Sequence, residues 1–427
     1  MKVSTKTALN KTRVKCLNCQ AVFFILLRLC SVSIKLLKMK RMFLISYMFL
    51  TIQAALIAGD NKTLINYMED VIYSELLNED RTLWIYTPQN YNLEKEKKYP
   101  VLYVLDGRYN FQYTVTIANY LYECDLIPEL IIVGIINTNR NRDMLPTYVE
   151  NVENSGGADV FSQSLISEIN PFIDSNFRTL GYNILFGHSY SGLFTQYQFF
   201  NYCCTFNSYI AASPSVYWDN MVVMNQNNDL KLTKLIYNYF SVGSHERDDM
   251  VTGTAMLDSV LHNVAPENLN FKYEYMKGED HSTTRLKTLY NGLEFTFKKW
   301  YYPFKPDNSN WNLDSLNSYY KSLSVRLQVD ILPPEFTYYY IGYFHLRQEN
   351  KDEALKTFHT ANTLYPHSIK SYTNLATAYE RTGNADAAIK YYKMALEIAD
   401  KEDPLFKEIE LRIEKIINEG VKNSQPL

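Results

Sequence analysis

The chain has 427 residues, which is enough for two or three domains, one of them with a large core. Hydrophobic residues make up 46% and charged residues 21%, a globular composition that excludes disorder over most of the chain. The formal net charge is −3 and the body has no basic cluster, so the sequence gives no basis for nucleic-acid binding.

The N-terminal region has the features of an export signal. Lys38, Lys40 and Arg41 precede an apolar stretch at 42–57, and small residues offer a cleavage point near Ala58. The stretch carries polar residues and is short for a membrane span, so we expect no stable transmembrane anchor. These features predict a periplasmic or secreted protein.

Residues 1–38 do not fit such a signal, and we expect translation to begin at Met39 or Met42. Three of the six cysteines fall in this leader, two of them with C-x-x-C spacing but without a second pair or a nearby histidine. The remaining cysteines are too few for a disulfide framework. The sequence therefore predicts no metal site and implies no organic cofactor.

From about residue 59 to residue 302, strand and helix patterns alternate. Continuous Val, Ile, Leu and Tyr runs separated by helical lengths indicate a doubly wound, mostly parallel α/β sheet covered on both faces. The predicted strands are 71–77, 81–87, 99–105, 130–136, 183–186, 206–212, 234–242 and 268–276. The helix candidates include 160–176, starting near the capping residue Asp159, and 193–202.

The stretch 182–200 predicts a strand, a tight turn and a helix, with Ser189 at the apex. Its motif, GHSYSG, departs from G-x-S-x-G because Ser191 stands where the second glycine is usual. A serine on such a turn is exposed at the end of a sheet, and the N–H of Tyr190 points to the same place. Ser189 is therefore a candidate nucleophile, and Tyr190 a candidate oxyanion donor.

A second oxyanion donor is expected after the strand that ends in Leu-Asp-Gly107. Gly107 allows close backbone approach, and the N–H of Arg108 or of Tyr109 could face a substrate. We assign this role to Arg108. The preceding Asp106 is interpreted as a turn residue whose side chain bonds its own backbone.

Reactive groups in parallel sheets gather at the carboxyl ends of strands, and this rule selects the remaining candidates. Of the seven histidines, His281 follows the last predicted strand and completes the order serine, acid, histidine, so we predict that it is the base. The loop after the preceding strand offers three acids. Glu246, Asp248 and Asp249 all remain open on the residues alone.

Several segments together resemble the Putative esterase family of α/β hydrolases, whose members include S-formylglutathione hydrolases and siderophore esterases. The matching segments are YPVLYVLDG (99–107), VGIINTNRNRDMLP (133–146), GHSYSGLF (187–194), AASPSVYWDN (211–220), YFSVGSHERDDM (239–250) and GEDHSTT (278–284). The resemblance implies a Ser189–Glu246–His281 triad, although siderophore esterases of this type have been described as using a serine–histidine pair.

The resemblance also suggests that Arg142, Asp143 and Trp218 border the substrate cleft. The alternative for Arg142 and Asp143 is an ion pair that fixes the shape of their loop. The alternative for Trp218 is an aromatic side chain that packs a loop at the rim.

Beyond residue 302 the pattern becomes helical. After a linker at 303–312, residues 313–427 contain a 34-residue repeat, in which Ala354, Phe358 and Ala361 recur as Ala388, Tyr392 and Ala395. This is the tetratricopeptide signature, and helices at 313–329 and 404–418 are expected to complete the array. Residues 313–418 could bind a protein or peptide partner. The alternative is a helical buttress for the first domain or a dimer contact.

The sequence thus predicts a serine carboxylic-ester hydrolase, acting on a small-molecule ester through an acyl-enzyme. Two alternatives stay open. An acyltransferase would use the same triad with an alcohol in place of water. A non-catalytic protein would act through its repeat domain.

Overall fold

The computed structural model describes residues 65–92, 95–225, 230–304, 311–401 and 404–423. The predicted leader, its cleavage point and most of the predicted linker lie outside these residues.

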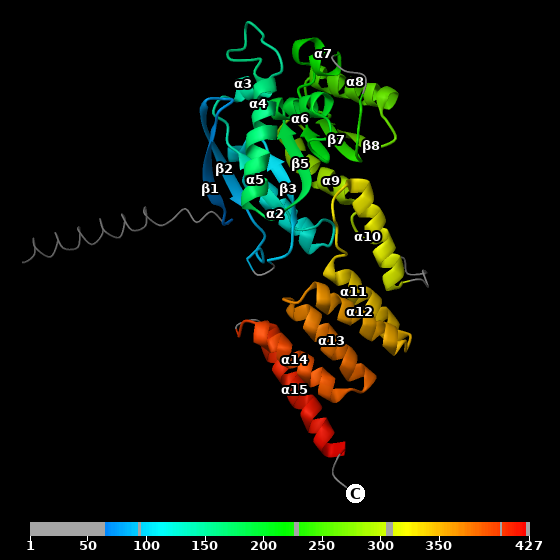
Figure 1. The fold of residues 1–427 in the computed structure, drawn as a ribbon. Helices are drawn as coiled ribbons and strands as arrows, with labels where there is room; N and C mark the ends of the chain where they lie inside the picture. The colour runs from blue at the N-terminus through cyan, green and yellow to red at the C-terminus, as the bar shows by residue number, and fades with distance from the viewer. Residues whose placement is uncertain (1–64, 93–94, 226–229, 305–310, 402–403, 424–427) are drawn as a thin grey trace, which may run out of the picture. The chain divides into compact units, whose positions relative to one another are not determined.

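In the described part of the chain, eight strands form one sheet in the order β1-β2-β4-β3-β5-β6-β7-β8 (Figure 1). They are β1 (Met68–Ser74), β2 (Glu79–Tyr86), β3 (Tyr99–Val104), β4 (Ile131–Ile135), β5 (Thr179–His188), β6 (Ser208–Ala212), β7 (Ile236–Gly243) and β8 (Leu269–Met276). The pairs β1–β2 and β2–β4 are antiparallel, and all other neighbours are parallel. The predicted mostly parallel sheet is confirmed.

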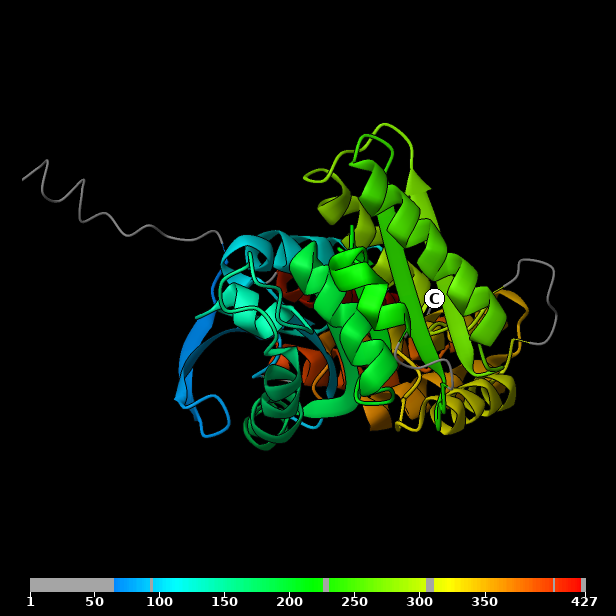
Figure 2. The ribbon, with the colours of Figure 1, turned by 90° about the horizontal axis from the view of Figure 1, so that it is seen from above.

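Helices cover both faces of the sheet, seen from above in Figure 2. They are α2 (Gly107–Glu123), α3 (Arg140–Met144), α4 (Ala158–Ser164), the π-helix η1 (Leu165–Ile169), α5 (Asn170–Asn176), α6 (Tyr190–Asn201), α7 (Trp218–Asn225), α8 (Asp248–Val264) and α9 (Thr284–Phe297). Helices α2 and α9 contact each other on one face of the sheet. On the other face, Leu193 of α6 and Leu257 of α8 belong to the same hydrophobic core as the strand residues Leu185 and Phe240. Strands β3, β4 and β6 are buried at every position because both faces are covered.

The helix predicted at 160–176 differs from the structure in two ways. It begins at Ala158 with Gly157 as its N-cap, and the carboxylate of Asp159 instead accepts hydrogen bonds from Tyr197 and Tyr202. Its middle is the π-helical segment η1, which leads directly into α5. Pro171 in the first turn of α5 has no N–H for a regular helical bond, which accounts for the wider turn before it.

The C-terminal region consists of helices, as predicted. They are α10 (Leu313–Leu327), α11 (Glu335–Arg347), α12 (Lys351–Leu364), α13 (Ile369–Thr382), α14 (Ala385–Ile398) and α15 (Pro404–Asn423). The repeated residues, Ala354, Phe358 and Ala361 with their counterparts Ala388, Tyr392 and Ala395, are all buried. Their small and aromatic side chains let neighbouring helices pack closely, as the tetratricopeptide pattern predicts.

The strand–helix turn at Ser189 depends on close packing at Gly187. A Cβ atom at this position would lie 2.2 Å from the carbonyl oxygen of Ser191 and 2.7 Å from Thr195 Oγ1. The nearer atom is backbone and cannot move aside, so we expect Gly187→Ala to lower the free energy of unfolding by about 3 kcal/mol in urea titrations.

Gly278→Ala is the matched control, because Gly278 has a positive φ of 83° but a Cβ atom added there would have no neighbour within 4 Å. Its cost should be only about 1 kcal/mol, from the backbone conformation. Equal losses in the two variants would contradict the packing described for Gly187.

Candidate active site

Ser189 joins β5 to α6 and has a strained backbone, with φ 63° and ψ −118°. Its N–H donates to the carbonyl of Ala212 at 3.0 Å, and its own carbonyl accepts from the N–H of Leu193 at 2.8 Å. A non-glycine residue holds such angles only where its surroundings fix them, and such strain is concentrated at functional sites. The turn predicted from the sequence is therefore present, with Ser189 at its apex.

His281, in the loop after β8, is paired with Glu246, in the loop after β7. His281 Nδ1 lies 2.7 Å from Glu246 Oε2, and the side chain of Glu246 is 1% exposed. Of the other acids in that loop, Asp249 pairs with Arg247 and Asp248 lies in the first turn of α8. Among the three candidates, it is Glu246 that the fold brings to the histidine.

The carboxylate of Glu246 has two further donors. Its Oε1 accepts from Ser213 Oγ at 2.6 Å and from the N–H of Gly243 at 2.7 Å. Burial alone would raise the pKa of Glu246, but the hydrogen bonds from His281, Ser213 and Gly243 outweigh it and lower the pKa from 4.5. Glu246 is thus held as a carboxylate facing the imidazole.

His188, the residue before Ser189, connects the elbow to the histidine loop. Its Nε2 lies 2.7 Å from the carbonyl oxygen of His281, and the two imidazole rings are 4.5 Å apart between centroids. The hydroxyl of Ser189 makes no hydrogen bond with any described residue. In structures without a substrate, the link between nucleophile and base is often long, so this geometry does not exclude the pair.

Backbone donors stand at the starts of α6 and α2, which follow the neighbouring strands β5 and β3. Tyr190 is the first residue of α6 and Arg108 the second of α2, so neither N–H has an acceptor within its own helix. The N–H of Tyr109, the alternative to Arg108, already donates to the carbonyl of Asp106 at 2.9 Å.

Arg142 and Asp143 lie in an ion-pair network with two residues of β2. Asp143 has no exposed surface and pairs with Arg81 at 2.5 Å, while Arg142 contacts Glu79 at 2.6 Å and Asp143 at 2.8 Å. This arrangement corresponds to the loop-fixing alternative, and it leaves Asp143 no surface from which to contact a substrate.

Trp218 lies beside the predicted oxyanion residue. Its Nε1 donates to Thr147 Oγ1 at 3.0 Å, its ring meets that of Tyr190 edge to face at 5.8 Å between centroids, and it is 5% exposed. Trp218 therefore packs between the loop of Thr147 and the first residue of α6, with little of its surface exposed.

The sequence predicts Asp106 to be a turn residue whose side chain bonds its own backbone, and this prediction is wrong. The carboxylate accepts no capping bond; it receives a two-point contact from Arg140 at 2.7 and 2.8 Å and bonds from Asn137 and Ser191. A signal was present in the sequence, because Asp106 and Arg140 each follow a buried strand, and β3 and β4 are neighbours.

The ring of His188 is held neutral. Burial and the nearby His281 lower the pKa of His188 from 6.5 to about 3. The unfolded chain therefore binds a proton below pH 6.5 that the folded chain does not, so stability falls as the pH falls from 6.5 toward about 3.

As the pH falls from about 7.5 to about 5, proton uptake by His188 in the unfolded chain should lower the free energy of unfolding by about 2 kcal/mol. Urea titrations of the wild type and of His188→Asn at both pH values measure it. The variant lacks the titrating ring, so its loss of stability over this range should be smaller by that amount. The same pH dependence in both proteins would contradict the neutral ring.

Within the described ranges, no group of three or more His, Cys, Asp or Glu residues could hold a metal ion. None of the described helices has the length and apolar character needed to cross a bilayer.

The sheet order, the parallel strands and the strand–serine–helix turn define an α/β-hydrolase fold. The family model described as Putative esterase matches residues 74–294, just over half of the chain, and a tetratricopeptide-repeat model matches residues 335–401. The chain therefore belongs to the Putative esterase family, with tetratricopeptide repeats after the esterase region.

Two characterised relatives are similar over part of their length. The siderophore triacetylfusarinine C esterase of Aspergillus fumigatus is 26% identical over 38% of this chain and 65% of its own. The ferri-bacillibactin esterase BesA of Bacillus subtilis is 28% identical over 37% of this chain and 62% of its own. In both cases the match spans less than two thirds of the relative.

A solved structure supports the fold. The IroE-like serine hydrolase from Shewanella oneidensis superposes with a TM-score of 0.60 at 24% identity, over 70% of this chain and all of that chain.

Proposed function

We propose that this chain is a serine esterase that cleaves carboxylic esters through an acyl-enzyme. The observation that carries the proposal is the hydrogen bond between His281 and the buried carboxylate of Glu246, at the same sheet edge as the strained turn of Ser189. A nucleophile, a base and an acid that orients the base are the groups that this chemistry needs.

In the proposed reaction, Ser189 Oγ attacks the ester carbonyl carbon while His281 Nε2 takes its proton. The negative charge that develops on the carbonyl oxygen is stabilised by the N–H groups of Tyr190 and Arg108. The C–O bond to the alcohol then breaks, and the departing oxygen takes the proton from His281. Water then loses a proton to His281 Nε2 and attacks the acyl carbon. The bond from this carbon to Ser189 Oγ breaks, Oγ takes the proton back from His281, and the acid is released.

Glu246 would keep His281 in the tautomer with its proton on Nδ1 and stabilise the imidazolium that forms. Its lowered pKa supports this role, because an ionised carboxylate is required there. With an alcohol in place of water the same groups would perform acyl transfer, which is the alternative reaction.

The named relatives act on siderophores, so ester-linked siderophores are the first substrate class to test. We propose that the exposed edge of Trp218 borders the substrate beside Tyr190. Arg142 would act on the site only through the shape of its loop, since its guanidinium is occupied by Glu79 and Asp143.

We also propose that the protein is exported, with its leader removed near Ala58, on the basis of the basic residues and apolar stretch before that position. N-terminal sequencing of protein recovered outside the cytoplasm tests this. An intact N-terminus there would contradict cleavage.

Ester hydrolysis should depend on the three side chains to different degrees. Steady-state kinetics with a chromogenic acyl ester should show kcat falling about 10⁴-fold or more in Ser189→Ala and His281→Ala, and about 10²- to 10⁴-fold in Glu246→Gln. Asp249→Asn, in the first turn of α8, is the matched control and should keep wild-type activity, since its carboxylate contacts Arg247 and the N–H of Met250. Full activity in Ser189→Ala would contradict the mechanism.

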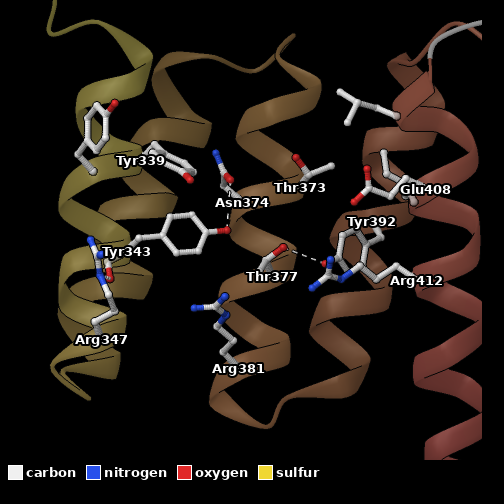
Figure 3. Close-up of a pocket in the computed structure, with 13 residues that line it drawn as sticks. Tyr339, Tyr343, Arg347, Thr373, Asn374, Thr377, Arg381, Tyr392, Glu408 and Arg412 are labelled. Carbon is white, nitrogen blue, oxygen red and sulfur yellow. Dashed lines mark hydrogen bonds between the residues drawn. The ribbon is translucent and has the colours of Figure 1, made fainter.

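The repeat region has a groove that favours a second function, binding of a partner. The groove has a volume of about 570 Å³ (Figure 3). It is lined by Tyr339, Tyr340, Tyr343, Arg347, Thr373, Asn374, Thr377, Arg381, Tyr392, Leu405, Glu408, Ile409 and Arg412. Side chains from α11, α13, α14 and α15 thus meet in one place, and they include four tyrosines, three arginines and one glutamate.

The charges in this groove fit an acidic partner. Arg412 is paired with Glu380 at 3.1 Å, whereas Arg347 and Arg381 make no ion pair with a described residue. Arg381 lies 5.3 Å from the ring centre of Tyr343. We propose that an extended acidic peptide binds here, with carboxylates on the two arginines and apolar contacts on the tyrosines.

A fluorescein-labelled glutamate-rich peptide of about ten residues should bind the full chain in anisotropy titrations, and a lysine-rich peptide should not. Arg347→Glu and Arg381→Glu should each weaken binding about tenfold, because each removes a charged hydrogen bond and adds repulsion. Lys393→Glu, an exposed charge change outside the groove, is the control. Equal binding of both peptides, or no effect of the arginine variants, would contradict the assignment.

A further inference from the structure

Ser191 occupies the position where the usual elbow motif has its second glycine, and its hydroxyl is fully buried. It accepts a hydrogen bond from the N–H of His188 at 2.8 Å, and its proton has two acceptors within reach, Asp106 Oδ2 at 2.7 Å and the carbonyl oxygen of His188 at 2.9 Å. The bond to the carboxylate is the shorter and is charge-assisted. The close helix–strand approach occurs at the next residue, where a Cβ on Gly192 would lie 2.9 Å from the carbonyl oxygen of Ala212. The side chain of Ser191 therefore does more than fill the place of a glycine, because its hydroxyl makes specific hydrogen bonds.

Asp106, the acceptor of this bond, is the N-cap of α2 and has a left-handed backbone with φ 52°. Its carboxylate is 6% exposed and also accepts from Arg140 Nε at 2.7 Å, from Arg140 Nη2 at 2.8 Å and from Asn137 Nδ2 at 2.5 Å. Four donors on one buried carboxylate fix its position, and with it the first turn of α2.

Arg140 contacts the elbow from the other side. Its guanidinium lies 5.3 Å from the ring centre of Tyr190, and its Nη2 is 3.4 Å from the carbonyl oxygen of His188. Ser191 and Arg140 therefore each connect Asp106 to the residues that flank Ser189.

We propose that Ser191, Asp106 and Arg140 form a brace that sets the distance between the starts of α2 and α6, and so between the two backbone donors of the oxyanion site. The inference rests on the proposed function, because those donors are the N–H groups of Arg108 and Tyr190. None of the three brace residues would touch the reacting atoms; they are positioning residues. A glycine at position 191 could not make this connection.

The brace needs an ionised carboxylate. Burial would raise the pKa of Asp106, but the hydrogen bonds and charge of Arg140 with the bonds from Ser191 and Asn137 lower it. These partners therefore favour the ionised form of the carboxylate. Small displacements of oxyanion donors are costly for catalysis, which is why a rigid support for them matters.

The test compares Ser191→Ala and Ser191→Gly with Ser208→Ala in the full chain. Ser208 is the matched control, because it is also fully buried and bonds one hydroxyl, that of Thr296, at the opposite end of β6. For each variant we measure the unfolding temperature, kcat and KM for an acyl ester, and the affinity for phenylboronic acid. The boronic acid forms a tetrahedral adduct on the serine and so reports on the oxyanion site.

Both Ser191 variants should lose at least tenfold in kcat, less than the roughly 10²- to 10³-fold cost of removing an oxyanion donor outright. KM should change less than about twofold, and boronate affinity should fall in parallel with kcat. Adding Ser191→Ala to Asp106→Asn should cost little more, because both break the same bond. Ser208→Ala should lower only the unfolding temperature.

An active wild type whose Ser191 variants behave like Ser208→Ala overturns the brace and leaves the proposed function intact. A folded wild type that neither hydrolyses esters nor binds the boronate contradicts the proposed function itself, and the oxyanion role of the brace falls with it.

Discussion

The chain must turn from a strand into a helix within one residue at Ser189, and the site is arranged around this turn. The angles at Ser189 are held by the backbone bonds to Ala212 and Leu193, and the space is provided by Gly187 and Gly192. Because β5 lies at the middle of the sheet, with β3 on one side and β6 on the other, the loops after those strands reach the same edge. The fold thereby brings residues that are far apart in the sequence to the sheet edge where Ser189 lies.

Two buried carboxylates flank this turn in different surroundings. Glu246 faces the ring of His281 and is held by Ser213 and the backbone of Gly243, whereas Asp106 faces a guanidinium and stabilises structure behind the elbow. Both have lowered pKa values despite burial, because their donors outweigh the loss of hydration. One carboxylate is thus placed to orient the imidazole of His281, and the other supports the backbone at the start of α2.

Local patterns allowed part of this site to be predicted from the sequence. The apolar run, the glycine spacing and the helical period that follows are all local, so the turn at Ser189 could be placed, and the order of strands selected His281. The choice among the acids could not be made from the residues, since Glu246 is distinguished by its contacts with Ser213 and Gly243, which exist only in the folded chain. The resemblance to esterases supplied that choice.

Other features depend on the order of strands in space. The strands are arranged with β4 between β2 and β3, and this order makes neighbours of Asp106 and Arg140, which are 34 residues apart. A turn aspartate that bonds its own backbone is the ordinary local outcome, so the distant partner was missed. The π-helical segment before Pro171 was missed for a similar reason, because apolar periodicity does not register a single widened turn.

The central claim is that Ser189 carries the acyl group during ester cleavage. Mass spectrometry of the protein, quenched in acid during turnover of a slowly hydrolysed acyl ester, tests this directly. We expect a mass increase equal to that of the acyl group, located on the peptide that contains Ser189 and absent from Ser189→Ala. An adduct on another residue, or ester hydrolysis by Ser189→Ala at the wild-type rate, would contradict it.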